Sequence, residues 1–141
     1  MHHSHKRNSF LKRKKHKLEG NNYSCVLCSN NVEETAFHVF FSCPFSQACW
    51  QLLGIHWDFA GEFFFQMMKQ AKQQFHHPFF MEIFIIAGWQ IWKQRNNFIF
   101  DRGHPSLESW KRLFCEEARL QACRLCEDKR HEFLLCIDSL P

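Results

Sequence analysis

Three cysteines and one histidine between residues 25 and 43 constrain this chain more than any other feature. The chain reads Cys25-Val-Leu-Cys28, then nine residues, His38, four residues and Cys43. Two thiols at this short spacing form a chelating turn, and the distant histidine and cysteine complete a tetrahedron around a soft divalent ion. Three thiolates and one imidazole favour Zn²⁺ in a structural site with no open position. We therefore predict one Zn²⁺ per chain, with these four residues as its ligands.

The residues between the ligands indicate how such a site is built. An Asn-Asn dipeptide after the second cysteine supplies a turn, and residues 33–41 have a helical pattern. His38 is then expected to project from a helix that ends near Cys43, just before Pro44. The alternative to a metal site is a set of reduced, partly buried cysteines.

Segments around this pattern resemble the reverse-transcriptase zinc-binding domain. The similar segments are Cys25-Val-Leu-Cys28, Glu33-Glu34-Thr35, Phe37-His38-Val39-Phe40-Phe41, Ser42-Cys43-Pro44-Phe45-Ser46 and Trp50, followed by a second block, Trp89-Gln-Ile-Trp-Lys-Gln-Arg-Asn96 with Ile99-Phe100. A tail with Pro105-Ser106 and a long final helix is also similar, so the resemblance runs from about Arg7 to the end.

The resemblance carries implications for function. The domain it points to lies at the C-terminal end of the polyprotein of plant LINE-type, non-LTR retrotransposons. It implies an accessory module of a reverse transcriptase, with the polymerase part of that polyprotein as a partner. Because no polymerase precedes the motif, the resemblance implies a fragment or domesticated remnant of such an element.

Charge is distributed unevenly along the chain. The first 19 residues contain seven Lys or Arg and one acidic residue, whereas the remainder contains eleven basic and thirteen acidic residues. The basic character therefore belongs to an N-terminal arm, residues 1–22. Its cluster is a candidate nucleic-acid-binding site or a nuclear address, and the alternative is a solvated tail without a partner. The candidate binding residues are Lys12, Arg13, Lys14, Lys15 and Lys17.

Apolar periodicity after the cluster predicts a mainly α fold with, at most, a short hairpin at the chelating turn. The chain has 141 residues, a length that corresponds to one domain. We expect a zinc-binding segment with its following helix (23–55) and a helical body packed on it (56–141). The expected helices cover residues 44–53, 62–75 and 79–100, followed by one long C-terminal helix from about 106 to 133.

The central helix, 79–100, is expected to pack on several sides. One apolar stripe consists of Phe80, Ile83, Phe84, Ala87 and Ile91, and a second of Trp89, Trp92 and Asn96. We interpret Arg95 and Asn96 as structural residues near the C-terminus of that helix, where Arg suits the helix dipole.

A second cysteine–histidine pattern lies near the C-terminus. Cys123, Cys126, His131 and Cys136 have the spacing of a zinc knuckle. A knuckle needs tight turns that glycines usually provide, and none lies between these residues. On a continuous helix the four side chains would point in different directions. We therefore do not expect a second metal site.

Catalysis is not expected from this sequence, and neither is a small-molecule substrate. The four aspartates are scattered, and no Gly-rich phosphate loop is present. A polymerase or nuclease needs clustered carboxylates to hold its metal ions. The most apolar run, residues 79–92, is too short to span a bilayer, so no membrane partner is expected. The polar, basic N-terminus indicates an intracellular protein, nuclear or cytoplasmic, that is not secreted.

Two functional hypotheses follow. In the first, the zinc-binding fold and the basic arm bind RNA or DNA as an accessory module of a reverse transcriptase. In the second, zinc is purely structural and the helical body is a protein-interaction or packing domain with no nucleic-acid role. The arm's charge favours the first, and the slightly acidic body favours the second.

Overall fold

The computed structural model describes residues 24–28, 30–60, 63–101 and 104–141. Helices dominate this part of the chain, and an isolated antiparallel bridge joins Ser24 to Glu33. The mainly α fold class is therefore confirmed. The helical elements are a π-helical turn η1 (His38–Ser42), α2 (Pro44–Leu52), α3 (Phe64–Gln74), α4 (Phe80–Asp101), α5 (Leu107–Ala122) and α6 (Glu127–Asp138).

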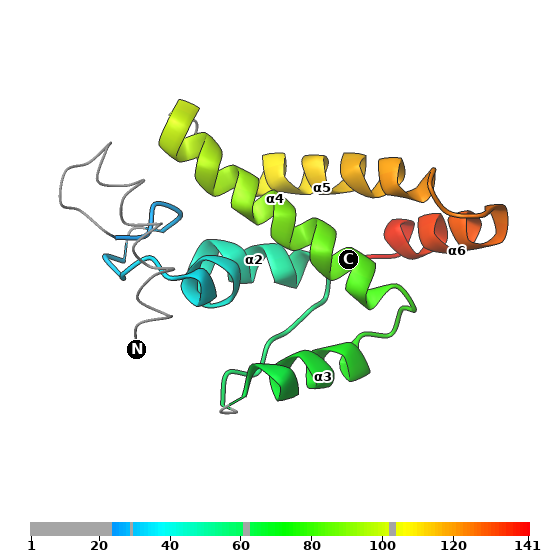
Figure 1. The fold of residues 1–141 in the computed structure, drawn as a ribbon, viewed down its shortest axis with the longest axis horizontal. Coiled ribbons are helices and arrows are strands. Elements are labelled where there is room, and N and C mark those ends of the chain that lie inside the picture. The colour runs from blue at the N-terminus through cyan, green and yellow to red at the C-terminus, as the bar shows by residue number, and fades with distance from the viewer. Residues whose placement is uncertain (1–23, 29, 61–62, 102–103) are drawn as a thin grey trace.

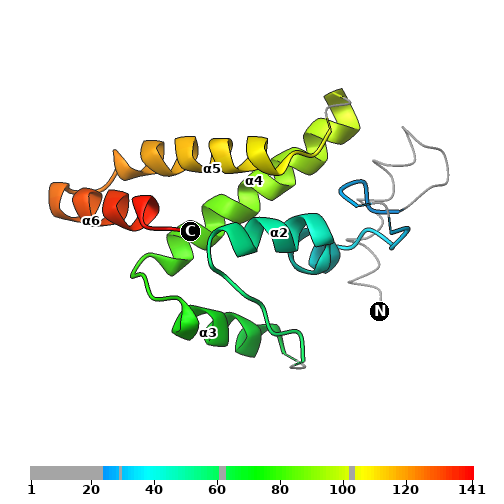
Figure 2. The ribbon, with the colours of Figure 1, turned by 180° about the vertical axis from the view of Figure 1, so that it is seen from behind.

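Helix α4 is the axis around which the other helices are arranged. In Figure 1 it crosses in front of α2 and α5, and Figure 2 shows the same crossing from behind. Helices α5 and α6 form an antiparallel pair on one side of α4, and α3 lies on the other side (Figure 1). Helix α2 packs against both α4 and α5, and η1 packs against α2 and α4. The metal-ligand segment is thereby held against the central helix.

Helix α2 begins and ends where local chemistry predicts. Pro44 occupies the first turn, where a missing backbone N–H costs nothing. Gly54 follows the helix with φ of 74°, a left-handed conformation that glycine adopts without strain. Cys49 and Trp50 are buried on its inner face, so Cys49 is a core residue as its helical position indicated.

The first apolar stripe of α4 is buried as predicted except for Phe84, which is half-buried, and the second stripe is only partly covered. Phe80, Ile83, Ala87 and Ile91 are buried. Trp89 was expected to pack against a neighbouring element, yet 51% of its surface is exposed. The expectation was wrong for Trp89 and held for Trp92, whose ring stacks on Phe40. Periodicity shows which residues share a helix face but not whether another element covers all of them.

Helix α3 is shorter than its predicted span and turns a slightly different face inward. Apolar residues at positions 64, 68, 71 and 75 predict one buried stripe on this helix. Ala71 and Phe75 of that stripe are buried together with Met67, whereas Phe64 is 54% exposed. The stripe prediction was therefore wrong at its first position.

The predicted long C-terminal helix is two helices. Helix α5 ends at Ala122, and α6 begins after Cys126, whose backbone is extended (φ −65°, ψ 162°). The guanidinium of Arg130 donates hydrogen bonds to the carbonyl oxygens of Ala122 and Leu125, at 3.3 and 3.1 Å. Ala122 is the last residue of α5 and Leu125 lies in the connection, so these bonds hold the end of α5 and the connection against α6.

The chain turns back at this point because α6 carries its own apolar residues. Phe133 and Ile137 are buried, and the ring of Phe133 contacts that of Phe79 edge-on with centroids 5.1 Å apart. A continuous helix would carry both residues away from the core. No glycine or proline marks residues 123–126, so helical pattern alone could not reveal the break.

Candidate metal centre

A short loop closed by backbone pairing presents the first two cysteines. The N–H of Cys25 donates to the carbonyl of Val32 at 2.8 Å, next to the Ser24–Glu33 bridge. Asn31 adopts a left-handed φ of 56°, which asparagine tolerates better than most residues. The predicted turn at the Asn-Asn dipeptide is thus present, and it holds both ends of the loop together.

The histidine is carried by a short π-helical turn rather than by a helix over residues 33–41. Helical structure begins at residue 36, and the hydroxyl of Thr35 accepts a hydrogen bond from the N–H of His38 at 3.0 Å. The N–H of Cys43 reaches the carbonyl of His38, five residues earlier, at 2.7 Å. This wider π-type turn brings the third and fourth ligand residues to the same side.

The four predicted ligand residues come together. The Sγ atoms of Cys25 and Cys43 are 3.9 Å apart, and Sγ of Cys28 is 3.4 Å from Nε2 of His38. All four ligand atoms lie within 4.8 Å of one another. A tetrahedral zinc ion with Zn–S of about 2.3 Å and Zn–N of about 2.0–2.1 Å requires ligand atoms about 3.6–3.8 Å apart. The cluster is close enough to bind a single metal ion, and its donors and spacing fit zinc.

The second ring nitrogen of His38 is also held in place. Its Nδ1 lies 3.1 Å from Oγ of Ser42, which is one turn further along the chain. Such a partner orients the imidazole and leaves Nε2 directed at the cysteines. Ser42 is therefore a positioning residue that ligand spacing alone did not reveal.

Hydrogen bonds and burial set the protonation of the thiols. The bond from Cys25 lowers the pKa of the Cys43 thiol to about 6, and the backbone N–H groups of Phe45 and Ser46 add to this effect. The pKa of Cys25 is raised because that thiol donates the proton, and because it is buried. Burial also raises the pKa of Cys28. The Cys43 thiol therefore loses its proton most readily and can bind a cation as a thiolate. The thiols of Cys25 and Cys28 lose their protons when a metal binds.

Comparison with protein families agrees with this geometry. Residues 3–50 match the family described as zinc-binding in reverse transcriptase. All four ligand residues lie inside the match, whereas the second similar block, 89–96, lies beyond it. No curated protein and no solved structure matches the chain.

A buried ion pair joins the metal-ligand segment to α4. Nη2 of Arg95 lies 2.7 Å from Oε1 of Glu34, and both side chains are at most 1% exposed. The guanidinium also donates to Oδ1 of Asn96 at 2.9 Å and lies 4.8 Å above the ring of Trp92. Arg95 is structural, as expected, but through this pair and not through the helix dipole.

The second cysteine–histidine pattern does not assemble in the described part of the chain. Cys136 is buried in the core, whereas Cys123, Cys126 and His131 are exposed. Two of these residues flank the break between α5 and α6, so the argument from a continuous helix was wrong. Among the residues described, the metal-ligand cluster that the structure brings together is Cys25, Cys28, His38 and Cys43.

The residues predicted to bind nucleic acid belong to the N-terminal arm. Lys12, Arg13, Lys14, Lys15 and Lys17 lie outside the described residues. Within the described residues, every helix is too short or too polar to cross a bilayer.

Proposed function

We propose that this chain is a non-catalytic zinc-binding accessory module of a retrotransposon reverse transcriptase, and that it assists nucleic-acid binding. The observation that carries the proposal is the cluster of four ligand atoms within 4.8 Å, inside a segment matching the reverse-transcriptase zinc-binding family. We assign Cys25, Cys28, His38 and Cys43 as the ligands of one zinc ion per chain.

Zinc in this module has a structural role. Cys25, His38 and Cys43 are buried, and a Cys₃His set fills all four positions of a tetrahedron. Such an ion has no vacant position at which to activate water. All eight cysteines are free, which suits the reducing interior of a cell.

The basic arm supplies the nucleic-acid contacts in this proposal. Seven of the eighteen basic residues precede Glu19, and residues 20–141 carry more acidic than basic groups. Contacts from a cluster of Lys and Arg to phosphates depend on salt and carry little sequence information. Binding is therefore expected to be weak and largely independent of sequence, for RNA as for DNA.

A salt titration tests the arm. Three to five phosphate contacts predict a log–log slope of affinity against salt of about −2 to −4, at about 0.7 per contact for single strands and 0.9 for duplex DNA. Changing Lys12, Arg13, Lys14 and Lys15 together to Gln should remove most of the affinity and flatten the slope. Fluorescence anisotropy with labelled single-stranded RNA and duplex DNA provides the measurement.

The matched control removes the same charge from the body. Lys69, Lys72, Lys111 and Lys129 are exposed, and their joint change to Gln should leave most of the affinity in place. If the arm variant binds as tightly as the parent, the arm assignment is wrong. If the parent itself does not bind at moderate salt, the second hypothesis, a zinc-stabilised protein-interaction or structural domain, replaces the first.

A further inference from the structure

An exposed apolar ridge runs along the outward face of α4. Met81, Ile85 and Trp89 are 40%, 61% and 51% exposed, and each lies one turn after the last. Trp92 continues the same face and is half-buried. Contiguous exposed apolar surface of this kind marks interaction sites.

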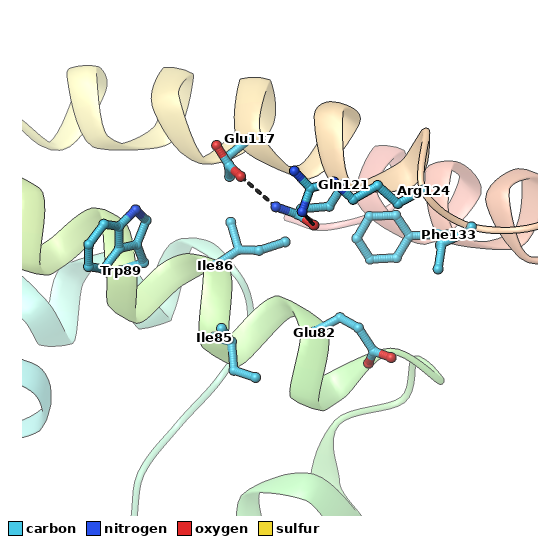
Figure 3. A pocket seen from close by; sticks show the side chains of 9 residues that line it. Glu82, Ile85, Ile86, Trp89, Glu117, Gln121, Arg124 and Phe133 are labelled. Carbon is cyan, nitrogen blue, oxygen red and sulfur yellow. Dashed lines mark hydrogen bonds between the residues drawn. The ribbon is translucent and has the colours of Figure 1, made fainter.

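A groove lies on each side of this ridge. The first, of about 380 Å³, lies between α4 and the α5–α6 pair, and its lining includes Glu82, Ile85 and Trp89 of α4. Figure 3 shows Ile86 of α4 pointing toward Gln121 of α5, with Arg124 just beyond the end of that helix. The second groove, of about 550 Å³, is almost wholly apolar, and its lining residues include Phe40, Phe64 and Trp92. Ile85 and Trp89 line both grooves, so they form the ridge between them.

Two opposite charges lie beside the ridge, at positions where a two-fold pairing of α4 would bring them together. Glu82 and Lys93 are exposed, lie about three turns apart on α4, and flank the ridge on the same side. Their midpoint falls between Ala87 and Gly88. If two copies of α4 pack antiparallel about this midpoint, Glu82 of each copy faces Lys93 of the other. The ridge of each copy then lies against a groove of its partner, which is the basis of helix packing.

The glycine at this midpoint permits close approach. A Cβ added at Gly88 would meet no atom within 4 Å, so packing inside the chain does not require glycine at this mid-helix position. Glycine there costs up to about 1 kcal/mol of helix stability relative to alanine. At a helix–helix crossing, however, a missing side chain lets two backbones approach.

We propose that a second copy of this chain occupies the face, through an antiparallel two-fold pairing of α4 centred between Ala87 and Gly88. The contact is independent of zinc chemistry and of nucleic-acid binding. Ile85 and Trp89 supply its apolar centre, and two Glu82–Lys93 pairs supply its polar rim. A contact built on one helix per copy lies at the small end of protein interfaces, so we expect dissociation constants in the micromolar range.

Charge reversal at the rim tests the pairing geometry. Glu82→Lys and Lys93→Glu should each weaken self-association roughly ten- to thirtyfold, because both symmetric pairs become repulsive. An equimolar mixture of the two variants should restore association, because every rim pair in the mixed dimer is again opposite in sign. Lys111→Glu, an exposed change on α5, is the control and should leave association unchanged.

Sedimentation equilibrium of the zinc-loaded full chain, freed of nucleic acid, measures the association over about 1–500 µM. Ile85→Asp tests the apolar centre and should give a monomer with the parent's helical circular dichroism, since Ile85 is mostly exposed. Monomeric parent protein throughout the range would overturn the proposal. So would a dimer in which the mixture of charge variants fails to recover, because another surface would then carry the contact.

Discussion

Cys28→Ser is expected to abolish zinc binding and to unfold the segment around the metal centre. Its Sγ lies 3.4 Å from Nε2 of His38, and a serine hydroxyl is a poor replacement for a thiolate ligand. Zinc binding in finger peptides is worth an apparent 10–16 kcal/mol or so, as much as the whole stability of many domains. Metal analysis of the reduced protein should give one zinc per chain for the parent and none for the variant.

Two other cysteines, one exposed and one buried, provide controls. Cys123→Ser changes an exposed thiol and should leave zinc content and stability unchanged. Cys49→Ser places a hydroxyl in the core and should lower stability by about 1–3 kcal/mol while zinc content stays at one. Loss of zinc in either control, or two zincs in the parent, would contradict the ligand assignment.

Hydrogen exchange after chelation tests the proposed division of the chain. We expect protection to be lost first in residues 24–55, because a bound ion stabilises its own surroundings most directly. Trp50, Leu53 and Ile55 nevertheless share one hydrophobic cluster with α4 and α5. Protection that disappears equally from α5 and α6 would show one cooperative unit instead of a zinc-binding segment and a separate body.

Arg95→Ala is expected to destabilise the protein by about 3–5 kcal/mol. The change leaves the carboxylate of Glu34 buried without its cation, which is far more costly than losing an exposed ion pair. Oε2 of Glu34 already lacks a hydrogen-bond partner among the described residues, so the arginine is its main compensation. Urea unfolding followed by circular dichroism gives the change in the free energy of unfolding.

A double substitution separates charge from packing at this site. Glu34→Leu with Arg95→Met replaces the buried pair with apolar side chains and should recover most of the lost stability. The matched control is Arg112→Ala, which breaks an exposed pair with Glu116 and should cost about 0.5 kcal/mol or less. If Arg95→Ala costs no more than this control, the buried pair does not couple the metal segment to α4. Zinc content should stay at one throughout, because neither residue is a ligand.

Sequence alone was sufficient for the features that depend on local spacing. The start of α2 at Pro44 and the left-handed Gly54 follow from chemistry within a few residues, and the metal cluster follows from the ligand spacing over residues 25–43. The buried stripe of α4 follows in the same way, because apolar residues at helical spacing share one face whatever lies beside it. These signals are local, so they survive without knowledge of the fold.

Tertiary structure decided the features that depend on distant partners. Glu34 and Arg95 are 61 residues apart, and nothing near either one indicates that they meet. The chain breaks between α5 and α6 because burial of Phe133 and Ile137 and the hydrogen bonds of Arg130 outweigh continuation of a helix. Trp89 is exposed because the described part of the chain provides no element to cover it. In the first two cases a contact free energy between remote segments completes or overrides a local preference, and in the third the lack of such a contact leaves an apolar side chain exposed.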